Sequence, residues 1–479
     1  MQLINTHYEP YRQQRLKHWN DVANLLDTQT TWGNYYHQRL AQLYQFLVAP
    51  GLNVLEIGCG KGDLLAAVQP ARGIGIDFSA EMIKRAQQRH PHLQFICADA
   101  HALPLEEPFD IIILSDLLND IWDVQTIFEQ VAKLSAPHTR LILNSYSRLW
   151  EQPLVLAEWL GLAHPTLHQN WLTVEDITNL LYLTHFEVIQ HHTEILFPLS
   201  IPLLTSLANH YLVKIWPFSL LALTNIIVAR SRPQCRSLPQ EPWVSVIVPA
   251  RNEAGNIAQI LARTPKMGSG TELVFVEGHS QDNTYATIEQ AIHAHPQRQC
   301  QLLRQTGKGK GDAVRLGFEQ AKGEILMILD ADLTVPPEEL PRFYEALHSS
   351  QGEFINGVRL VYPMEQQAMR FFNLLGNKFF SLAFAWLLEQ PLKDTLCGTK
   401  VLWKSDYEKI AANRNYFGDF DPFGDFDLLF GAAKLNLKII DLPIRYRERT
   451  YGTTNIQRWR HGWLLLKMVL FAARRIKFI

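Results

Sequence analysis

The sequence has no paired cysteines, no export signal and no excess of positive charge, and each absence excludes a class of protein. Its five cysteines include no C-x-x-C pair, so neither a zinc site nor a disulfide framework is expected. Its N-terminal segment has no apolar core followed by a small-residue cleavage site, as a secretory signal would have. The formal net charge of -2 argues against nucleic acid as a partner.

Long apolar runs are missing as well. No stretch of about 20 apolar residues is uninterrupted, as a membrane-spanning helix would require. Any contact with a membrane should therefore be peripheral. The unpaired cysteines fit a reducing compartment, so we expect a cytoplasmic protein bound at the inner face of the plasma membrane.

The chain is long enough for two domains of ordinary size. Residues 231–243 read SRPQCRSLPQEPW, with three prolines and no apolar periodicity, which indicates a linker between domains at 1–230 and 244–479. On both sides, short apolar runs alternate with amphipathic helical patterns, which is typical of β-α-β units around a mostly parallel sheet. Both domains are therefore predicted to be α/β.

A glycine-rich turn follows the first predicted strand. Residues 53–57 have the pattern of a buried strand, and Gly58, Gly60 and Gly62 then lead into a helical pattern. Glycine lets a ligand press against backbone that a Cβ would hold away, and N–H groups at a helix start attract anionic groups. Asp77 ends the next strand, where a carboxylate can accept hydrogen bonds from ribose hydroxyls. The alternative is a tight turn with a helix-capping aspartate.

Two further carboxylates follow predicted strands. Residues 95–97 lead to Asp99, and residues 109–114 lead to Asp116. The carboxyl ends of parallel strands meet at one edge of a doubly wound sheet, which is where such sheets bind ligands. A nucleoside pocket at this edge is therefore predicted.

This order of residues resembles the class I S-adenosylmethionine-dependent methyltransferases over residues 31–230. The turn reads E-x-G-x-G-x-G, not the G-x-G-x-x-G of dinucleotide enzymes, which argues against an oxidoreductase. The resemblance implies a Rossmann-like fold with S-adenosylmethionine as cofactor. The implied roles are Glu56, Gly58, Gly60 and Gly62 around the methionine part, Asp77 at the ribose, Asp99 and Ala100 at the adenine, and Asp116, a catalytic candidate, beside the reacting methyl group.

An apolar segment precedes the last predicted strand of the first half. Residues 196–222 contain three prolines, so they do not form a continuous apolar helix. We interpret them as a lid or a substrate-binding insertion.

Polar loops also follow predicted strands in the second half. Residues 324–329, apolar after Glu324, form a predicted strand that leads to Asp330 and Asp332. Two carboxylates one residue apart at a strand end suit Mg²⁺ or Mn²⁺ bound to a diphosphate, and such an ion would neutralise charge on a departing nucleoside diphosphate. The other candidate residues at these strand ends and in these loops are Pro249, Arg251, Glu253, Glu277, Lys308 and Asp312.

From residue 243 to about 449 the chain resembles family 2 glycosyltransferases, most of all the branch that acts on polyprenyl phosphates. The resemblance implies a GT-A fold and a UDP- or GDP-linked sugar donor. The implied roles are Pro249, Arg251, Glu253, Glu277, Lys308, Asp312 and Asp330 around the nucleotide sugar, with Asp330 and Asp332 as metal ligands and Asp332 catalytic. Glu277 stands where the family commonly has Asp, which leaves the base specificity open.

Two later segments extend this resemblance. Residues 394–400 are similar to a segment that faces the acceptor in the family, and residues 417–427 contain two G-D-F-D repeats, of which Asp425 and Asp427 best match the late acidic motif. A hydroxyl acceptor would need such a carboxylate to take its proton, whereas a phosphate acceptor would need positioning by cations. Helix caps and turns are the alternative reading.

Two C-terminal segments suit a membrane surface. Residues 370–388 predict a helix that is apolar except for one narrow polar stripe, formed by Arg370, Asn373, Asn377 and Ser381. From Arg445 onward the chain carries nine Lys or Arg against Glu448 alone. Apolar faces flanked by cations bind anionic membranes, although helices of this length can equally pack on a protein core.

The sequence thus predicts a bifunctional, membrane-peripheral enzyme. The first half would methylate an acceptor, and the second would transfer a sugar to a polyprenyl phosphate or a related lipid. The alternative is a glycosyltransferase that acts on a hydroxyl acceptor, a polysaccharide or glycolipid, with a non-catalytic S-adenosylmethionine-binding module in front of it.

Overall fold

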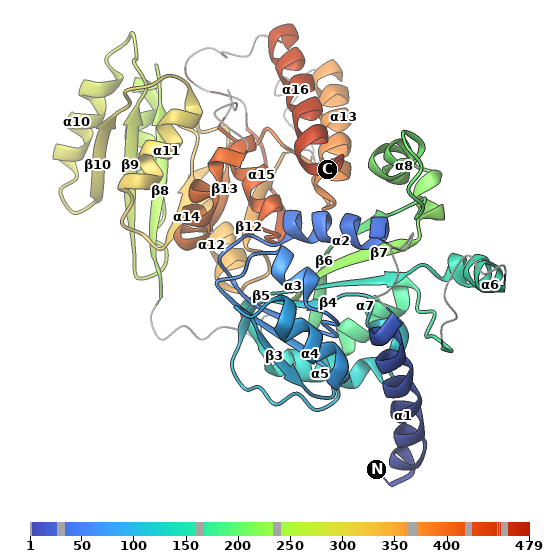
Figure 1. The fold of residues 1–479 in the computed structure, drawn as a ribbon. Helices are drawn as coiled ribbons and strands as arrows, with labels where there is room; N and C mark the ends of the chain where they lie inside the picture. The colour runs from blue at the N-terminus through green and yellow to red at the C-terminus, as the bar shows by residue number, and fades with distance from the viewer. Residues whose placement is uncertain are drawn as a thin grey trace. The chain divides into compact units, whose positions relative to one another are not determined.

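The chain forms two compact units, Met1–Arg232 and Pro233–Lys477 (Figure 1). Each is an α/β domain, as the alternation of strand and helix patterns predicts. The interior of the predicted linker, residues 233–240, lies outside the described residues. The computed structural model describes residues 2–25, 34–159, 167–232, 241–359, 361–362, 371–416, 424–447, 449, 451 and 458–479.

The first unit contains one sheet of seven strands: β1 Asn53–Ile57, β2 Arg72–Asp77, β3 Gln94–Cys97, β4 Phe109–Leu114, β5 Ser135–Tyr146, β6 Phe186–Glu194 and β7 Thr224–Ser231. Their order is β3-β2-β1-β4-β5-β7-β6. β7 is antiparallel to both of its neighbours, and the remaining pairs are parallel. The carboxyl ends of β1 to β6 therefore share one edge with the start of β7.

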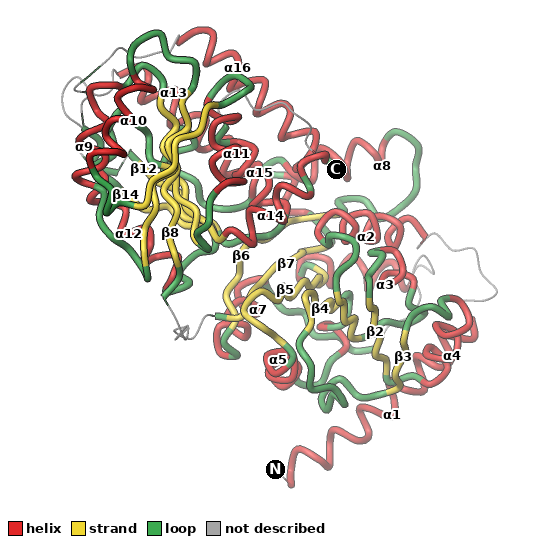
Figure 2. Tube along the Cα trace, turned by 90° about the vertical axis from the view of Figure 1, so that its left-hand side faces the viewer, coloured by secondary structure: helices red, strands yellow, loops and turns green. Residues whose placement is uncertain are grey.

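Helices cover both faces of this sheet (Figure 2). Alternate strand residues point to opposite faces, so in β4 Ile111 and Ile113 join one apolar cluster while Ile112 and Leu114 join the other. α2, α3 and α4 pack on the first cluster, and α5 and α7 on the second. The helices are α1 Gln2–Leu25, α2 Asn34–Leu47, α3 Asp63–Ala67, α4 Ala80–Arg89, α5 Val124–Lys133, α6 Glu151–Trp159 and α7 Val174–Leu183, with the short turns η1 Leu118–Asp120 and η2 Arg148–Trp150.

Residues 195–223, which we call the β6–β7 insertion, consist of short turns: α8 Leu204–Ser206, η3 Leu207–Tyr211, η4 Leu212–Lys214 and η5 Phe218–Leu221. α8 projects from the body of the sheet (Figure 1). Ala208 and Val213 are buried, but Leu203 is 87% exposed and Trp216 is 76% exposed. The insertion therefore has a packed side and an apolar exposed side.

The second unit contains another seven-stranded sheet: β8 Trp243–Ala250, β9 Gly270–Glu277, β10 Gln299–Arg304, β11 Ile325–Ile328, β12 Phe354–Val358, β13 Lys400–Trp403 and β14 Ile439–Pro443. Their order is β10-β9-β8-β11-β13-β12-β14. β13 is antiparallel to both neighbours, and the other pairs are parallel. The loops that leave β8, β9 and β11 therefore emerge at one edge.

Helices and turns flank this sheet and connect its strands: η6 Ala254–Asn256, α9 Ile257–Arg263, α10 Thr284–Ala294, α11 Lys310–Gln320, η7 Pro337–Glu339, α12 Leu340–His348, α13 Phe371–Leu388, α14 Lys404–Ala412, η8 Arg414–Tyr416, α15 Phe426–Lys434, α16 Arg458–Ala472 and η9 Ala473–Lys477. α13 and α16 lie side by side (Figure 1). Their inner faces bury Phe384 and Leu465 in the core.

The outer face of α13 differs from the predicted polar stripe. Ser381, a member of that stripe, is buried, whereas Phe379 and Leu382 are exposed. The helix thus packs on the core and still presents apolar side chains. In the part of the chain that the structure describes, no helix has the length and hydropathy needed to span a membrane.

Candidate functional sites

The three glycines between β1 and α3 serve different purposes. All three have positive φ, at 78° for Gly58, 50° for Gly60 and 75° for Gly62. A Cβ at Gly58 would approach Leu117 Cδ1 to 2.8 Å, and one at Gly62 would approach Phe95 Cζ to 2.5 Å, so packing requires both. A Cβ at Gly60 would meet no atom within 4 Å. Gly60 therefore opens onto space where a ligand can approach the backbone.

Two carboxylates flank this turn. Asp77, at the end of β2, accepts hydrogen bonds from the N–H groups of Gly60 at 3.0 Å and Ser79 at 2.9 Å, which ties the turn to the neighbouring strand. Glu56 of β1 is buried, and within the described ranges its Oε2 has no hydrogen-bond partner. Burial raises the pKa of Glu56 well above its usual value. An unsatisfied buried carboxyl beside an open glycine turn fits a polar or cationic ligand group.

Asp99 lies beyond β3, with the half-buried Ala100 next to it. It accepts hydrogen bonds from the Tyr8 hydroxyl at 2.5 Å and from the His101 N–H at 3.0 Å, and His101 Nδ1 lies 2.8 Å away. Burial opposes ionisation, but these hydrogen bonds outweigh it and lower the pKa of Asp99 to about 2. The sequence did not single out Tyr8, which α1 brings to this edge.

α1 makes further contacts along the same edge. The Trp19 indole donates to Asp120 at 2.5 Å, Arg15 pairs with Asp120 at 2.9 Å, and Ser79 donates to Asn20 at 2.6 Å. The helix is therefore bound to the candidate cofactor edge by polar contacts.

Asp116 belongs to a buried polar cluster beyond β4. Its backbone φ is 52°, which is rare for a residue other than glycine. Asp116 Oδ1 accepts hydrogen bonds from Tyr36 at 2.7 Å and Asn144 at 2.5 Å, and Tyr44 donates to Asn144 at 2.8 Å. Burial raises the pKa of Asp116, and these hydrogen bonds oppose the rise only in part.

In the second unit, Asp330 is paired with a lysine that no sequence motif singled out. Lys310, at the start of α11, lies 2.6 Å from Asp330 and 4.0 Å from Asp425. Burial opposes ionisation, but the attraction of Lys310 outweighs it and lowers the pKa of Asp330. A Cβ at Gly398 would overlap both Asp330 Oδ2 and Lys310 Nζ. The 394–400 segment is thereby held against the predicted metal ligand.

Asp332 and Glu253, both predicted site residues, pair with the same arginine, Arg449. Arg449 lies 2.7 Å from Asp332 and 3.0 Å from Glu253. The N–H and hydroxyl of Thr334 also donate to Asp332, at 3.1 Å and 2.7 Å. The sequence did not single out Arg449 either, because it stands in a generally basic segment.

The remaining predicted residues differ in exposure and in hydrogen-bond partners. Pro249 is half-buried in β8, whereas Arg251 and Lys308 are exposed. Glu277 accepts a hydrogen bond from the Ser280 N–H at 2.5 Å, and Asp312 accepts one from the Gly307 N–H at 3.0 Å.

Aspartates of the two later segments, residues 394–400 and 417–427, form ion pairs with arginines. Asp427 pairs with Arg414 at 2.9 Å, and Asp394 forms a two-point pair with the buried Arg359 at 2.7 and 2.9 Å. The first of the G-D-F-D repeats, within residues 417–423, lies outside the described residues. Within the described ranges, no group of three or more His, Cys, Asp or Glu side chains that could hold a metal ion is present.

Family models match both units. The model described as a methyltransferase domain matches residues 32–191, and the model for glycosyl transferase family 2 matches residues 245–408. The chain joins a methyltransferase domain to a family 2 glycosyltransferase domain. Both models describe transferase families, and they match separate parts of one chain.

Curated relatives include polyprenyl-phosphate transferases. A dolichol-phosphate mannosyltransferase of Saccharomyces cerevisiae is 38% identical over 22% of this chain and 40% of its own length. An undecaprenyl-phosphate 4-deoxy-4-formamido-L-arabinose transferase of Edwardsiella ictaluri is 35% identical over 44% of this chain and 62% of its own length. The chain thus covers less than two thirds of either protein. A dolichol-phosphate mannosyltransferase of Pyrococcus furiosus is 27% identical over 49% of this chain and 67% of its own length.

Solved structures of methyltransferases are also similar. Magnesium protoporphyrin IX methyltransferase of Synechocystis PCC 6803 is 22% identical, with a TM-score of 0.29 over 41% of this chain and 84% of that one. An S-adenosylmethionine-dependent methyltransferase of Mesorhizobium loti is 19% identical, with a TM-score of 0.31 over 40% of this chain and 96% of that one.

Gly398→Ala tests the packing of the glycosyltransferase site. The added Cβ must separate Asp330 from Lys310, so we expect a loss of about 1–3 kcal/mol in the free energy of unfolding. The matched control is Gly376→Ala in α13, where a Cβ meets nothing within 4 Å and alanine favours the helix. Denaturant unfolding, followed for the domain that contains both positions, measures the free energy of unfolding of each variant. Equal stability of the two variants would contradict the close packing at Gly398.

Proposed function

We propose that the first domain transfers a methyl group from S-adenosylmethionine. The observation that carries this proposal is the open face of Gly60 beside Glu56 Oε2, which lacks a partner among the described residues. Glu56 and the glycine turn would hold the methionine part, Asp77 the ribose, and Asp99 with Ala100 the adenine. When bound, the sulfonium would supply an already activated methyl group, so this domain needs mainly to position the acceptor.

Asp116 is the residue that would take a proton from a hydroxyl acceptor. Its carboxylate lies at the carboxyl end of β4, beside the strands that carry the cofactor residues. Tyr36 and Asn144 orient it through hydrogen bonds, and the raised pKa that burial causes makes it a stronger base than an exposed aspartate.

For the second domain we propose sugar transfer from a UDP- or GDP-linked donor to a polyprenyl phosphate. The names of the relatives support this acceptor class. Mg²⁺ or Mn²⁺, held by Asp330 and Asp332, would supply positive charge to the leaving diphosphate. Carboxylate ligands suit such a hard cation, and donor phosphates would complete its oxygen shell. Glu253 and the exposed Arg251 lie on the loop after β8 and Glu277 ends β9, at the edge that would surround the nucleotide.

Lys310 and Arg449 give this site its charge balance. Each neutralises one of the two predicted metal ligands, at 2.6 Å for Lys310 and Asp330 and 2.7 Å for Arg449 and Asp332. Both cations are therefore in place to contact an anionic diphosphate once the carboxylates bind a metal ion. Asp425, close to Lys310, would help to hold this lysine.

The site in the second domain would lie near a membrane. The acceptor class is a membrane lipid, and Phe379 and Leu382 of α13 are exposed beside the basic C-terminal segment. Apolar side chains next to cations favour binding to an anionic leaflet. We therefore propose a cytoplasmic enzyme that binds the inner face of the plasma membrane peripherally.

Gly60→Val tests the cofactor site. The valine would stand where the methionine part is proposed to lie, so calorimetry should detect no binding of S-adenosylmethionine. Gly51→Val is the control, because Gly51 also has a positive φ of 80° and a Cβ there would meet no atom within 4 Å, but it stands outside the turn. Equal affinity in both variants would rule out the proposed cofactor position.

Asp332→Asn tests the donor site. The change removes a carboxylate from the metal, so sugar transfer should fall by roughly 100-fold or more, while binding of S-adenosylmethionine stays as in the wild type. Glu338→Gln is the control, because this surface glutamate pairs with Arg263. A screen of UDP- and GDP-sugars with Mn²⁺ and lipid extracts, read by mass spectrometry, measures transfer; full activity of Asp332→Asn would refute its metal role.

The pH profile of methyl transfer tests Asp116. A proton acceptor must be ionised, so kcat should fall as the pH drops through the pKa of Asp116, which burial places above the usual value for aspartate. Asp116→Asn should lower kcat by about 100-fold or more and abolish this acidic limb. Tyr36 and His37 face the same carboxyl group, so Tyr36→Phe serves as a control that keeps the limb. An unchanged profile in Asp116→Asn would exclude Asp116 as the base.

A further inference from the structure

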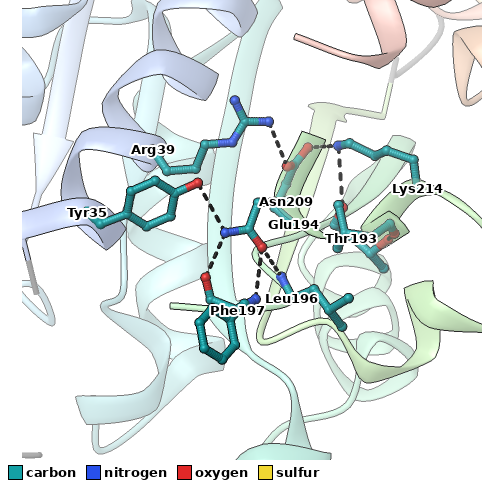
Figure 3. A network of polar contacts seen from close by, with 9 residues as sticks. Tyr35, Arg39, Thr193, Glu194, Leu196, Phe197, Asn209 and Lys214 are labelled. Atoms are coloured by element: carbon teal, nitrogen blue, oxygen red, sulfur yellow. Dashed lines mark hydrogen bonds and ion pairs between the residues drawn. The ribbon is translucent and has the colours of Figure 1, made fainter. Parts of the chain in front are cut away.

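A buried cluster of charges lies in the first domain outside the proposed cofactor residues (Figure 3). Arg39 of α2, Glu194 at the end of β6 and Lys214 of η4 are all buried. Arg39 Nη2 lies 3.4 Å from Glu194 Oε2, and Lys214 Nζ pairs with Oε1 of the same carboxylate. The cluster therefore holds two cations and one anion.

Arg39 has N–H groups that the cluster does not use. Among the described residues, its Nε and Nη1 have no hydrogen-bond partner. Figure 3 shows one end of the guanidinium pointing away from Glu194. Burial lowers the pKa of Arg39, but a guanidinium remains charged at neutral pH. A buried cation with unused donors is costly unless an anion accepts from them.

The cluster is at the edge where methyl transfer would occur. Glu194 stands opposite Thr224 in the sheet, and Thr224 stands opposite Tyr146 of β5. The Thr224 hydroxyl lies 3.5 Å from the Tyr36 hydroxyl, which in turn donates to Asp116. Thr224 therefore lies between the charged cluster, through its pairing with Glu194 in the sheet, and the proposed base, through its contact with Tyr36.

Asn209 ties the exposed β6–β7 insertion to α2 next to this cluster. Its side chain donates to the Tyr35 hydroxyl at 3.1 Å and accepts from the N–H groups of Leu196 and Phe197 at 2.8 Å (Figure 3). The same insertion exposes a group of large apolar side chains: Leu203, Leu204, Leu207, Trp216, Leu220 and Leu221. Buried cationic donors therefore lie beside an apolar exposed surface.

We propose that Arg39 and Lys214 bind the anionic oxygen group of an amphiphilic methyl acceptor, whose apolar chain contacts the β6–β7 insertion. The anion would give the unused N–H groups of Arg39 an acceptor and would balance the second cation. This assignment rests on the proposed function of the first domain, because it takes this ligand as the methyl acceptor. It specifies a phosphate- or carboxylate-bearing lipid with a hydroxyl near Asp116, the chemistry of a lipid-linked sugar, as the acceptor class.

The test compares three probes on the full-length protein. Calorimetry and thermal unfolding are run with decyl phosphate below its micelle concentration, with inorganic phosphate and with decanol. Decyl phosphate should bind and raise Tm more than the other two, because it alone has both the anion and the chain. If inorganic phosphate stabilises the protein as much as decyl phosphate, the site binds free anions and the lipid assignment is wrong.

Variants then locate the site. Arg39→Met leaves Lys214 and Glu194 as a balanced pair, so the domain should fold, and the Kd of the site for decyl phosphate should rise about tenfold or more. Arg230→Met is the matched control, a buried arginine in the same domain that pairs with Glu187 at 2.6 Å; its Kd should not change. Unchanged affinity in Arg39→Met overturns the proposal.

Two further measurements keep the outcomes distinct. Should Arg39→Met fail to unfold cooperatively, Arg39→Lys replaces it; this variant keeps the charge with fewer donors and should bind decyl phosphate more weakly than the wild type, and equal binding contradicts the assignment. Binding of S-adenosylmethionine is measured in the same samples. If the wild type does not bind S-adenosylmethionine, the methyltransferase proposal is wrong and the anion site still stands. If the cofactor binds normally but the Arg39 variant binds decyl phosphate as well as the wild type does, the anion site alone is wrong.

Discussion

Parallel strands bring their carboxyl ends to one edge of a sheet, and both candidate sites depend on this constraint. In the first domain it places the loops after β1, β2, β3 and β4 side by side, so that the Asp77 carboxylate reaches the Gly60 N–H at 3.0 Å. In the second it places the loops after β8, β9 and β11 together, so that Asp332 and Glu253 share one arginine. Each site is assembled from residues that are distant in the sequence.

The elements of this edge could be predicted from the sequence because their signals are local. β1 has the predicted bounds, and Asp77 ends β2 as expected, since a short apolar run followed by glycine and aspartate has few other interpretations. The sequence indicated backbone access for the glycine turn as a whole, and in the structure Gly60 has open surroundings. Gly58 and Gly62 were grouped with it, but their neighbours Leu117 and Phe95 depend on the fold and not on the local sequence.

Side-chain partners across long distances in the chain could not be predicted. Tyr8 meets Asp99 across 91 positions, and Arg449 meets Asp332 across 117. Lys308 stays a prediction for the donor loop, and the contact of its neighbour Lys310 with Asp330 could not be foreseen, because only the start of α11 decides which lysine faces that carboxylate. An ion pair between distant residues leaves no periodic pattern in the sequence. Such pairs can therefore be identified only once the helices and strands are packed together.

The contact between α1 and Asp99 has a consequence for any ligand that uses the same carboxylate. The Tyr8 hydroxyl and an adenine amino group would be alternative hydrogen-bond donors to the Asp99 carboxylate. Tyr8 competes at a high effective concentration because it belongs to the same molecule. The measured affinity for a nucleoside would then be the intrinsic affinity multiplied by the fraction of molecules in which α1 has released Asp99. Truncations or tags at the N-terminus would accordingly change the apparent dissociation constant without touching any residue of the glycine turn.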